Sequence, residues 1–577
     1  MKPLLLGLDA KGTRVKLTPA ARRTHLHVIG SSGSGKSKFL EHLIRQDIRN
    51  GQGFCLIDPH GSLYEEVFAY CAHSVAPREI VLLNLSQPSH VVGFNPFRKS
   101  AAADVSVQVD NRIVATMHAW GAPNSDATPT LERTLRLVYT MLIEQELPFQ
   151  RAEELIDFHA KDIREPLIRN VQSTLIRKEW EELQQLRARD WRAEVLSAKN
   201  RLFRLLTSTA LARFFSPSAN AIDVEDIVNN GKVLLVNLAA SDQLSSENAR
   251  VFGALLVNEF FEVAKRRDTS RTLKPFYLYL DEFQRFVSLD VTAMLDEIRK
   301  FGLYCVLAHQ RFGHLDENLI DAVLTNCRIK AVFGGLPVQS AQIMAEELFV
   351  GKLNPRKIKA AIYQTKFWPQ YARDTIRTRS KSLGHSVGRG ENYGTASMSG
   401  SATGEFFMPG DWFSGGGATG TSTTESSMTT TVQASHSSET DFWGETEGEA
   451  DVPIFIPVPF KELSSVQYFS LEEQLTQLTA ALKEQYPRHC FIKIQSQETQ
   501  PMLVPLIRRE FTSLRNRRWY EEKVLARIRA RQATEIDREL KRVQESPKAP
   551  SVPGGRKGAE IAVRKSKTHW EDLIGRE

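Results

Sequence analysis

The sequence predicts an α/β protein built around a phosphate-binding loop, and three observations carry this prediction. Short and almost wholly apolar runs alternate with helical patterns, which is typical of a parallel sheet covered on both faces. The first run, Leu26–Ile29, leads directly into the glycine-rich stretch 30–37, which opens a helical pattern. A later run, Phe276–Leu280, ends in the acidic pair Asp281 and Glu282. We therefore expect a nucleotide-binding domain with a mostly parallel central sheet.

The strands of this sheet are expected at seven apolar runs, joined by right-handed helical crossovers. In chain order they are Leu26–Ile29, Phe54–Ile57, Ile80–Leu83, Val233–Leu238, Phe276–Leu280, Tyr304–Ala308 and Ile329–Phe333. The first three fall in residues 1–99 and the last four in 226–383. These two ranges are predicted to form one ATPase domain.

The long gap between the third and fourth strands reads as helices throughout. Thr128 and Pro129 suit the cap and first position of one of them. One face of that helix is apolar and consists of Leu131, Leu135, Val138 and Leu142. Residues 100–225 are therefore predicted to be an all-helical insertion in the sheet domain.

Residues 384–449 change abruptly in composition, since more than half of them are Gly, Ser or Thr. Such a segment buries too little apolar surface to offset its ordering entropy, so we expect a flexible linker or loop. Residues 450–507 are expected to be a small α/β segment that returns to the main fold. Its elements are a run at Val452–Phe460, a helix over Ser470–Glu484 and a strand at Cys490–Ile494.

The net charge of +7 comes from the C-terminal tail. Residues 508–577 hold 19 Lys and Arg against 11 Asp and Glu, which leaves the rest of the chain at −1. A basic, helical and partly disordered tail is predicted here, and it is a candidate DNA-binding element. Its candidate phosphate and base contacts are Arg515, Arg517, Arg518 and Trp519, with Tyr520 also available for stacking.

Composition limits the class of protein. No apolar run approaches the roughly 18 residues that a membrane span needs. The opening apolar run is too short for a signal peptide, and Asp9 interrupts it. The five cysteines are scattered without metal-ligand spacing, which favours buried reduced thiols. We expect a cytoplasmic protein.

The glycine-rich octet carries the clearest chemistry. It consists of Gly30, Ser31, Ser32, Gly33, Ser34, Gly35, Lys36 and Ser37. Its glycines let backbone N–H groups turn toward phosphate oxygens. Lys36 can reach the β- and γ-phosphates of ATP, and the Ser37 hydroxyl can bind Mg²⁺.

Three further strand ends are expected at the same edge of the sheet. Asp281 is predicted to hold Mg²⁺, and Glu282 to act as the general base on the attacking water, which favours hydrolysis over binding alone. Gln310, at the end of the strand Tyr304–Ala308, can contact both the γ-phosphate and that water. Asp58 ends the strand Phe54–Ile57 at the sheet edge where ligands bind.

Taken together, these motifs resemble the HerA/FtsK class of DNA-pumping ATPases. They are the octet, Ile57–Gly61, Leu280–Phe283, Ile298–Leu303, Ala308–Gln310 and Leu324–Lys330. Within that class the similarity is greatest to the motor domain of TraD/TraG-type coupling proteins of conjugation and type IV secretion. The resemblance covers about 20–370, with a weaker echo at 452–495.

The resemblance implies a RecA-like fold, a ring of six subunits, and ATP sites between neighbours. Such a site takes an arginine from the adjacent subunit to neutralise charge on the transferring phosphoryl group. Arg299 occupies the matching position, and Arg328 is the second candidate. Coupling proteins of the familiar kind carry N-terminal membrane helices. This sequence shows none, which weakens the expectation of docking to a secretion channel.

The leading hypothesis is an ATP-driven DNA translocase of conjugative or type IV secretion transfer. One alternative is a nucleotide-gated adaptor that recruits a relaxase or protein substrate without moving DNA. Another is a HerA-like motor in DNA end processing or antiphage defence, working with a separate nuclease. Stimulation of ATP hydrolysis by DNA separates the first from the second.

Overall fold

The computed structural model divides the chain into two compact units. One comprises residues 1–334 and 486–577 and is called here the ATPase unit, and the other comprises 335–485. The sequence instead predicts that the ATPase domain ends at residue 383 and that the chain returns to the main fold after residue 449. The described residues are 2–75, 79–86, 88–100, 103–121, 129–216, 222–287, 295, 297–382, 390–405, 421–436, 444–508 and 512–545.

The centre of the ATPase unit is a parallel sheet whose strands lie where the apolar runs predict them. They are β3 (Leu26–Ile29), β4 (Gly53–Asp58), β5 (Ile80–Asn84), β7 (Val233–Asn237), β8 (Phe276–Leu280), β9 (Leu303–His309) and β10 (Ile329–Phe333). Their order is β10-β3-β9-β8-β4-β7-β5, and every pair is parallel. The α/β fold class with a mostly parallel sheet is confirmed.

Four antiparallel strands extend the sheet beyond β10. They are β15 (His489–Ile494), β16 (Gln500–Leu503), β1 (Leu4–Leu8) and β2 (Arg14–Leu17), in the order β10-β15-β16-β1-β2. Because β15 pairs with β10 in full register, the chain returns to the main sheet as the sequence predicts. The strands β1, β2 and β16 were not anticipated. Neither β2 nor β16 is a continuous apolar run, because exposed and buried residues mix along each of them.

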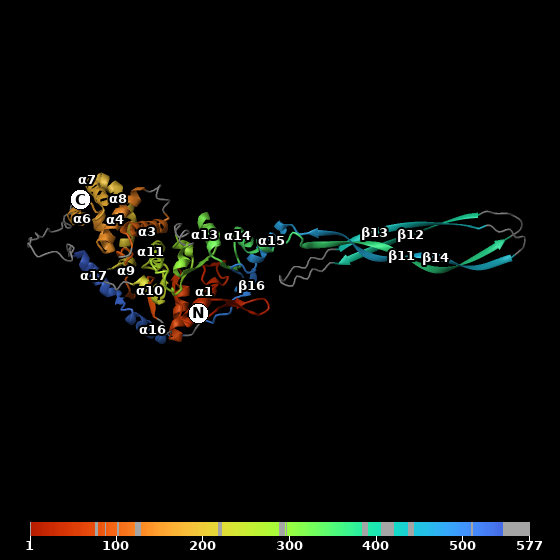
Figure 1. Ribbon diagram of the computed structural model, residues 1–577, viewed down its shortest axis with the longest axis horizontal. Coiled ribbons are helices and arrows are strands. Elements are labelled where there is room, and N and C mark those ends of the chain that lie inside the picture. The colour runs from red at the N-terminus through yellow and green to blue at the C-terminus, as the bar shows by residue number, and fades with distance from the viewer. Residues whose placement is uncertain are drawn as a thin grey trace, which may run out of the picture. The chain divides into compact units, whose positions relative to one another are not determined.

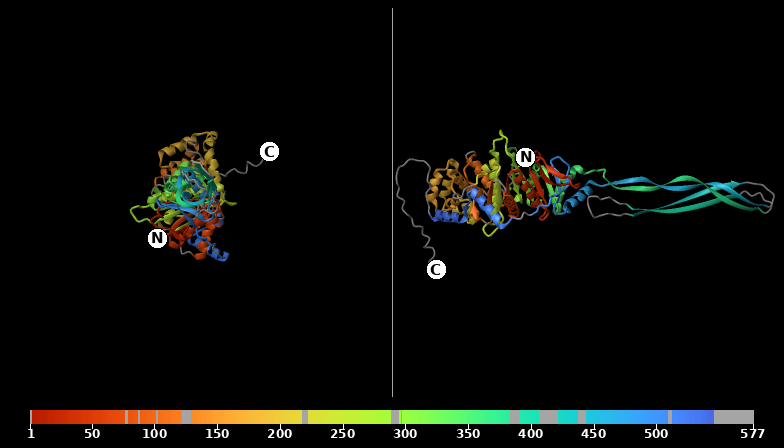
Figure 2. Two further views of the ribbon diagram at one scale, coloured as in Figure 1. Left: turned by 90° about the vertical axis from the view of Figure 1, so that its right-hand side faces the viewer. Right: turned by 90° about the horizontal axis from the view of Figure 1, so that it is seen from below.

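Helices cover both faces of the sheet, and each face has its own apolar core (Figures 1 and 2). One core includes α1 (Lys36–Asn50) and α2 (Ser62–Ser74). The other includes α10 (Val224–Asn230), α11 (Ser246–Lys265) and α13 (Glu317–Asn326), together with the insertion. All five cysteines are buried free thiols, as expected.

Among its described residues the insertion consists of helices joined by short turns and has no strand. Its helices are α3 (Val105–Ala119), α4 (Pro129–Glu144), α5 (Ala152–Ile156), α6 (Lys161–Arg169), α7 (Thr174–Gln185), α8 (Ala188–Leu206) and α9 (Thr209–Phe214). The predicted apolar face of α4 is buried at Leu131, Leu135, Val138 and Leu142. Pro129 is the first residue of α4, whereas its expected cap, Thr128, lies outside the described residues.

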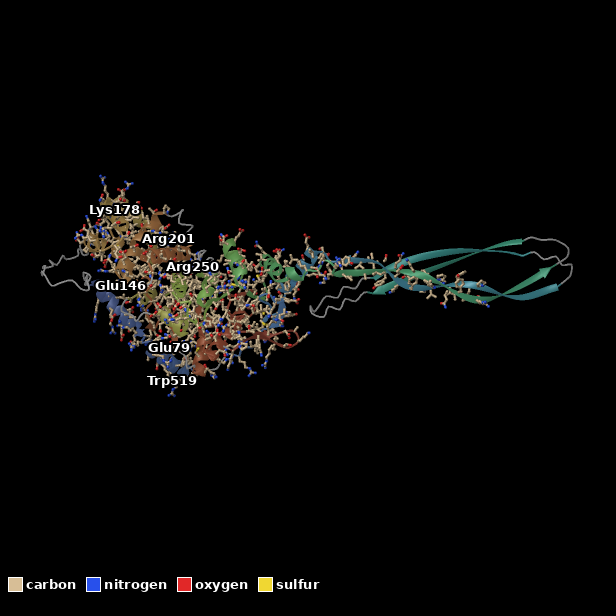
Figure 3. The ribbon with its side chains drawn as sticks, viewed as in Figure 1. Glu79, Glu146, Lys178, Arg201, Arg250 and Trp519 are labelled. Carbon is tan, nitrogen blue, oxygen red and sulfur yellow. The ribbon has the colours of Figure 1, made fainter. Side chains whose placement is uncertain are left out.

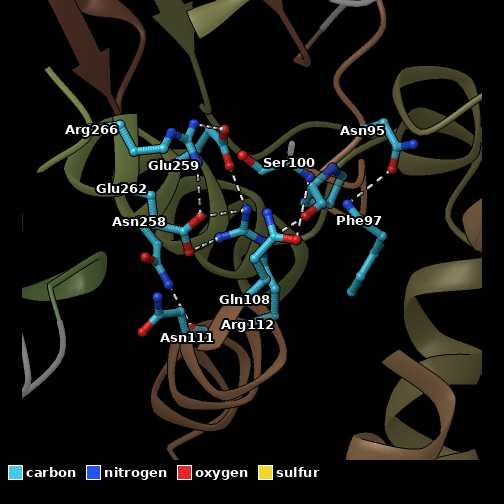
Figure 4. A network of polar contacts seen from close by, with 11 residues as sticks. Asn95, Phe97, Ser100, Gln108, Asn111, Arg112, Asn258, Glu259, Glu262 and Arg266 are labelled. Carbon is cyan, nitrogen blue, oxygen red and sulfur yellow. Dashed lines mark hydrogen bonds and ion pairs between the residues drawn. The ribbon is translucent and has the colours of Figure 1, made fainter. Parts of the chain in front are cut away.

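A buried ionic cluster ties the insertion to the sheet domain (Figure 4). The Arg112 guanidinium on α3 forms ion pairs with Glu259 and Glu262 of α11, the latter at 2.7 Å. Its Nε donates to the Pro96 carbonyl at 2.5 Å. Since removing one partner would leave an uncompensated buried charge, this cluster fixes α3 against α11.

The basic tail folds onto the ATPase unit over residues 514–545. It forms α16 (Leu514–Arg527) and α17 (Ala533–Glu545), with Arg531–Gln532 pairing as β17 with β6 (His90–Val91). Tyr520 is 3% exposed and its ring lies 6.0 Å from that of Phe68 in α2, so the expectation that it stacks on bases is wrong. Tyr520 belongs to the buried apolar face of α16, together with Val524 and Leu525. Residues 546–577 lie outside the described residues.

The second unit joins two helices to long strand pairs. The helices are α14 (Val338–Phe349) and α15 (Leu471–Lys483), the latter with a capping box between Ser470 and Glu473. One antiparallel pair joins β11 (Ile358–Ser382) to β14 (Gly444–Tyr468), and the other joins β12 (Gly390–Glu405) to β13 (Thr421–His436) (Figure 1).

These strands differ from the linker predicted for 384–449. An antiparallel ladder satisfies backbone N–H and C=O groups strand to strand, and Thr favours strands, so pairing does not require the apolar composition used in the prediction. The intervening residues 383–389, 406–420 and 437–443 lie outside the described residues.

Among the described residues, no helix is both long enough and apolar enough to cross a membrane.

Candidate ATPase site

The phosphate-binding loop lies between β3 and α1 at the carboxyl edge of the parallel strands. Gly33 and Gly35 have φ angles of 77° and 112°, which glycine adopts at little cost. A Cβ atom on Gly30 would lie 2.5 Å from the Cβ of Phe333 at the end of β10. The glycines are therefore required by backbone geometry and by close packing against the neighbouring strand.

Lys36 reaches back across this loop. Its Nζ donates to the carbonyl oxygens of Gly30 and Ser31 at 2.5 and 2.9 Å. Burial lowers the pKa of Lys36, while the charges of Glu282 and Asp281 oppose that shift. The lysine thus lies close enough to the acidic pair for their charges to interact, and Ser37 is exposed in the first turn of α1.

Glu282 and Gln310 come together at the ends of neighbouring strands β8 and β9. Gln310 Nε2 donates to Glu282 Oε1 at 2.6 Å, and Gln284 Nε2 donates to Oε2 at 2.7 Å. Glu282 has a φ of 48°, a strained value for a non-glycine residue that is typical of functional sites. Both oxygens of the expected base are therefore oriented by amides. Sequence reasoning found Gln310 and missed Gln284, whose position two residues after Glu282 carries no recognisable signal.

Asp281 is buried beside two other carboxylates. Burial, together with the charges of Asp58 and Glu282, raises its pKa to about 7, although Lys36 opposes the shift. Asp58 itself accepts from the backbone N–H groups of His60 and Tyr64 at 2.8 and 2.9 Å. Its position at the ligand edge is as predicted, but its direct contacts are with the turn into α2.

Two buried histidines join β3, which leads into the loop, to its neighbour β9. His27 on β3 and His309 on β9 lie with their Nε2 atoms 2.7 Å apart, and His309 Nδ1 lies 3.1 Å from the Arg311 carbonyl. Burial lowers the pKa of His309 to about 3, so the pair is neutral at physiological pH. One ring donates and the other accepts, which fixes β9 directly before Gln310. The sequence gives no sign of this pair.

Arg299 and Arg328 lie at the opposite edge of the sheet from the loop. Arg299 belongs to the 3₁₀ turn Ile298–Phe301, which precedes β9, and Arg328 directly precedes β10. Because these strands run parallel to β3, neither arginine lies at the ATP site of its own chain. Arg299 is half-buried, and its Nε has no hydrogen-bond partner among the described residues, whereas Arg328 is exposed.

The four candidate DNA contacts lie in the first turns of α16. Arg515 and Arg518 are exposed. Trp519 is 50% exposed, and it is labelled in Figure 3. Arg517 instead pairs with Glu65 and lies 5.3 Å from the ring centroid of Phe68. Its guanidinium holds α16 against α2, so it has less freedom to contact phosphate than the other three.

Residues 11–366 match the family of type IV secretion-system coupling protein DNA-binding domains. No curated protein sequence matches the chain.

Three solved structures illustrate its structural neighbours. The unbound conjugative coupling protein TrwBdeltaN70 is 12% identical, with 87% of this chain and 89% of that chain covered and a TM-score of 0.48. TrwB with ADP and Mg²⁺ is 16% identical, with 59% and 78% covered and a TM-score of 0.43. VirB4 of Thermoanaerobacter pseudethanolicus is 14% identical, with 60% and 87% covered and a TM-score of 0.40.

The family match covers well over half of the chain and confirms the predicted resemblance. With the loop lysine, the acidic strand end and Gln310 assembled at one sheet edge, the protein is a P-loop ATPase that belongs to the type IV secretion coupling-protein family.

Proposed function

We propose that this ATPase translocates DNA during conjugative or type IV secretion transfer, as a ring of six copies. The proposal rests on the residues suited to ATP hydrolysis that meet at one edge of the sheet. The chain that carries them belongs to a family of coupling-protein DNA-binding domains. A nucleotide-gated adaptor has no need of a base whose two oxygens are both oriented by amide donors.

The residues of this edge have distinct roles in hydrolysis. Backbone N–H groups of 30–37 and the start of α1 bind the phosphates, and Lys36 neutralises their charge. Glu282 accepts the proton of the attacking water while Gln310 and Gln284 hold its carboxylate. Gln310 is placed to report whether the γ-phosphate is present, since it is bonded to the base itself.

The donor set also fits Mg²⁺. The exposed Ser37 hydroxyl and the Asp281 carboxylate are hard oxygen ligands, and Asp281 lies close enough to Lys36 for their charges to interact. A cation here would relieve the repulsion among Asp281, Asp58 and Glu282. When bound, Mg²⁺ neutralises developing phosphate charge and orients the phosphates.

A ring accounts for the position of the arginine candidates. Arg299 lies a full strand length from its own loop, roughly 20 Å for the seven residues of β9. We assign it to the ATP of a neighbouring copy, with Arg328 as the alternative. DNA is the proposed substrate of the ring, and a relaxase or a channel component is a further proposed partner.

DNA-dependent ATP hydrolysis tests the proposal. The wild-type protein should hydrolyse ATP faster when double- or single-stranded DNA is added, whereas Glu282→Gln should bind ATP and DNA without turnover. ATP hydrolysis that is indifferent to every DNA tested would contradict translocation and favour the adaptor.

A further inference from the structure

The β11–β14 pair exposes apolar side chains on an unusual scale. Six large apolar residues of β11 and seven of β14 are at least 36% exposed. They are Ile358, Ile362, Tyr363, Phe367, Trp368 and Tyr371 on β11, and Ile454, Phe455, Ile456, Val458, Phe460, Leu463 and Tyr468 on β14. We call these two strands, over 358–374 and 453–468, the apolar ribbon.

Both faces of the ribbon expose large apolar side chains, interspersed with charged ones such as the ion pair Lys366–Glu462. Tyr371 is directly opposite Phe455, and their ring centroids are 4.6 Å apart on one face. On the other face Trp368 is opposite Val458, and its ring lies 6.5 Å from that of Phe460. A two-stranded ribbon is marginally stable in water by itself. Because each face of this one exposes large apolar side chains, neither face can be left in water at little cost.

The free edges of the ribbon are poorly suited to pairing with another strand. Pro369 of β11 is opposite Pro457 of β14, and Pro459 follows two residues later. Proline fits a ladder only where its missing N–H would point away from the partner strand, so these positions leave the free edges without donors. Addition of another strand at this point is therefore disfavoured, and the faces remain as docking surfaces.

The exposed area is large enough for a stable interface. At roughly 80 Å² for each side chain, scaled from the 150–250 Å² that a fully buried aromatic covers, the ribbon exposes about 1,000 Å² of apolar surface. Divided between the two faces, this leaves about 500 Å² of apolar surface for each neighbour, close to the apolar share, roughly 60%, of the about 800 Å² that a standard interface buries per partner. Together the two faces exceed the about 300–600 Å² of the largest apolar patch on a typical monomer.

We propose that the apolar ribbon is an oligomerisation element that packs face to face against the ribbons of other copies of this chain. Copies of one chain supply what the ribbon needs: two apolar layers of matching length, one for each face. In a closed ring each subunit has two neighbours, so both faces can be covered by the same heterologous contact. The inference builds on the proposed ring, but the two can fail separately.

Site-directed disulfide formation tests the contact in the full-length protein. The five native cysteines are buried, so introduced thiols are the reactive ones. In a heterologous contact one face of a ribbon meets the opposite face of the next, so the test variant carries one thiol on each face, Ile456→Cys with Phe455→Cys. Phe203→Cys on α8 is the matched control, because Phe203 is 53% exposed but lies on the insertion. Mild oxidation should link subunits of the double variant into dimers and higher oligomers on denaturing gels, and should leave both the single variant Ile456→Cys and the control Phe203→Cys monomeric.

A polar variant gives the second readout. Trp368→Thr with Ile456→Thr should weaken self-association at least tenfold by analytical ultracentrifugation while ATP affinity is unchanged. Absence of both crosslinking and a shift in assembly would overturn the proposal, yet a ring that still hydrolyses ATP with DNA stimulation would leave the proposed function standing. Sedimentation with anionic phospholipid vesicles that is lost in the variant, without self-association, would also overturn it and identify lipid as the occupant.

Arg488 lies against the phosphate-binding loop. Its backbone N–H donates to the Ser34 carbonyl at 2.9 Å, and a Cβ on Gly35 would lie 3.1 Å from its nitrogen. Arg488 has a φ of 71°, a left-handed value that is rare for a side-chain-bearing residue. Something must hold it in that conformation.

The Arg488 side chain supplies the restraint. Its Nε and Nη2 both donate to the Val504 carbonyl, at 3.0 and 2.8 Å, and the Val504 N–H donates back to the Arg488 carbonyl at 2.9 Å. At the other end of the loop, the Gly334 carbonyl accepts from Ser31 N and Oγ, both at 3.1 Å. The loop is thus held at one end by Gly334 and at the other by Arg488. Both residues belong to the ATPase unit, although the second unit separates them in sequence.

We infer that Arg488 is a positioning residue for ATP binding, which acts through the Ser34 carbonyl on the shape of the loop. Because the loop binds phosphate in the ground state and in the transition state alike, Arg488→Ala should raise KM for ATP about tenfold with kcat within about twofold. Arg488→Lys keeps the charge but has a single donor nitrogen, so its KM for ATP should lie between those of the wild type and Arg488→Ala.

Arg529→Ala is the matched control, since Arg529 is also left-handed, at 52°, but lies in the turn after α16. It should leave both constants unchanged. If Arg488→Ala binds ATP as the wild type does, or if KM, kcat and Tm all change together, Arg488 supports the fold alone and the inference fails.

Discussion

The central sheet and the apolar ribbon are both built from strongly apolar strands, but they differ in what covers them. In the sheet, β8 and β9 are buried along their whole length between two layers of helices. In the ribbon, Trp368 and Tyr371 are 68% and 73% exposed. An apolar strand therefore indicates burial without saying whether the covering surface belongs to the same chain.

The proposed chemistry and the proposed assembly belong to different regions of the molecule. Every residue proposed for hydrolysis within one chain lies at the carboxyl edge of the sheet, where parallel strands end together and helix N-termini point at the ligand. No residue of the ribbon is proposed for hydrolysis. Disrupting the two regions should therefore have different consequences.

The largest expected effect is at the sheet edge. Lys36→Ala should abolish measurable hydrolysis and weaken ATP binding, and Glu282→Gln should lower kcat by about 10³-fold or more while binding is kept. Trp368→Thr on the ribbon should retain ATP affinity. Steady-state hydrolysis and nucleotide titration check all three variants, and near wild-type turnover by Glu282→Gln would contradict the assignment of the base.

Arg299 tests whether neighbouring copies complete each site. Arg299→Ala should lower kcat by about 10³-fold if it acts on the ATP of a neighbour. Mixing Arg299→Ala with Glu282→Gln subunits should restore part of the activity, because some interfaces then combine an intact arginine with an intact base. No recovery at any ratio would exclude this role and redirect attention to Arg328.

Asp281 should reveal its raised pKa in both stability and activity. A carboxyl whose pKa rises from 3.8 to about 7 on folding stabilises the native state below pH 4 relative to neutral pH, and that contribution is lost as pH rises to 7. Asp281→Asn should therefore raise the free energy of unfolding at pH 8 without nucleotide, by on the order of 2–4 kcal/mol in chemical denaturation. An unchanged free energy of unfolding would mean that neighbouring groups already offset the cost of burying the charged Asp281 carboxylate.

The same group predicts the acidic limb of the pH profile. The kcat/KM for MgATP should fall below about pH 7 as Asp281 becomes protonated. Asp58→Asn removes a neighbouring negative charge and should shift that limb to lower pH. Because protonation of ATP is identical for both proteins, the difference between them isolates Asp281.

The smallest expected effect concerns the tail beyond α17. Deleting 546–577 removes 7 Lys and Arg and 4 Asp and Glu but none of the packed helices. DNA affinity should weaken, and the slope of log K against log[salt] should fall by about 0.7–0.9 for each phosphate that the shortened chain no longer neutralises. Basal hydrolysis should be unchanged. An unaltered slope would place the basic contacts of the tail in α16.

The sequence was most informative where a single interaction dominates. Buried parallel strands must be continuously apolar, so all seven could be placed to within a residue or two. The loop glycines, Lys36 and the pair Asp281–Glu282 are recognisable because phosphate chemistry restricts the residue types. Gln310 could be placed because it ends a strand next to β8.

Interactions that depend on tertiary neighbours were not predictable. The pair His27–His309 and the bond from Gln284 to Glu282 arise from strand order and a strained turn, which leave no local pattern. Tyr520 was expected in solvent because the basic residues of α16 mask an apolar face that packs on α2. The Gly, Ser and Thr strands were missed because ladder pairing needs no apolar signal.

The central claim is that ATP hydrolysis at the sheet edge moves DNA. Displacement of a third strand from a DNA triplex measures movement along the duplex directly. The wild-type protein with ATP should displace the strand in proportion to the ATP hydrolysed, and Glu282→Gln should not displace it although it binds both ligands. DNA-stimulated hydrolysis without displacement at any duplex length or salt concentration would contradict the account.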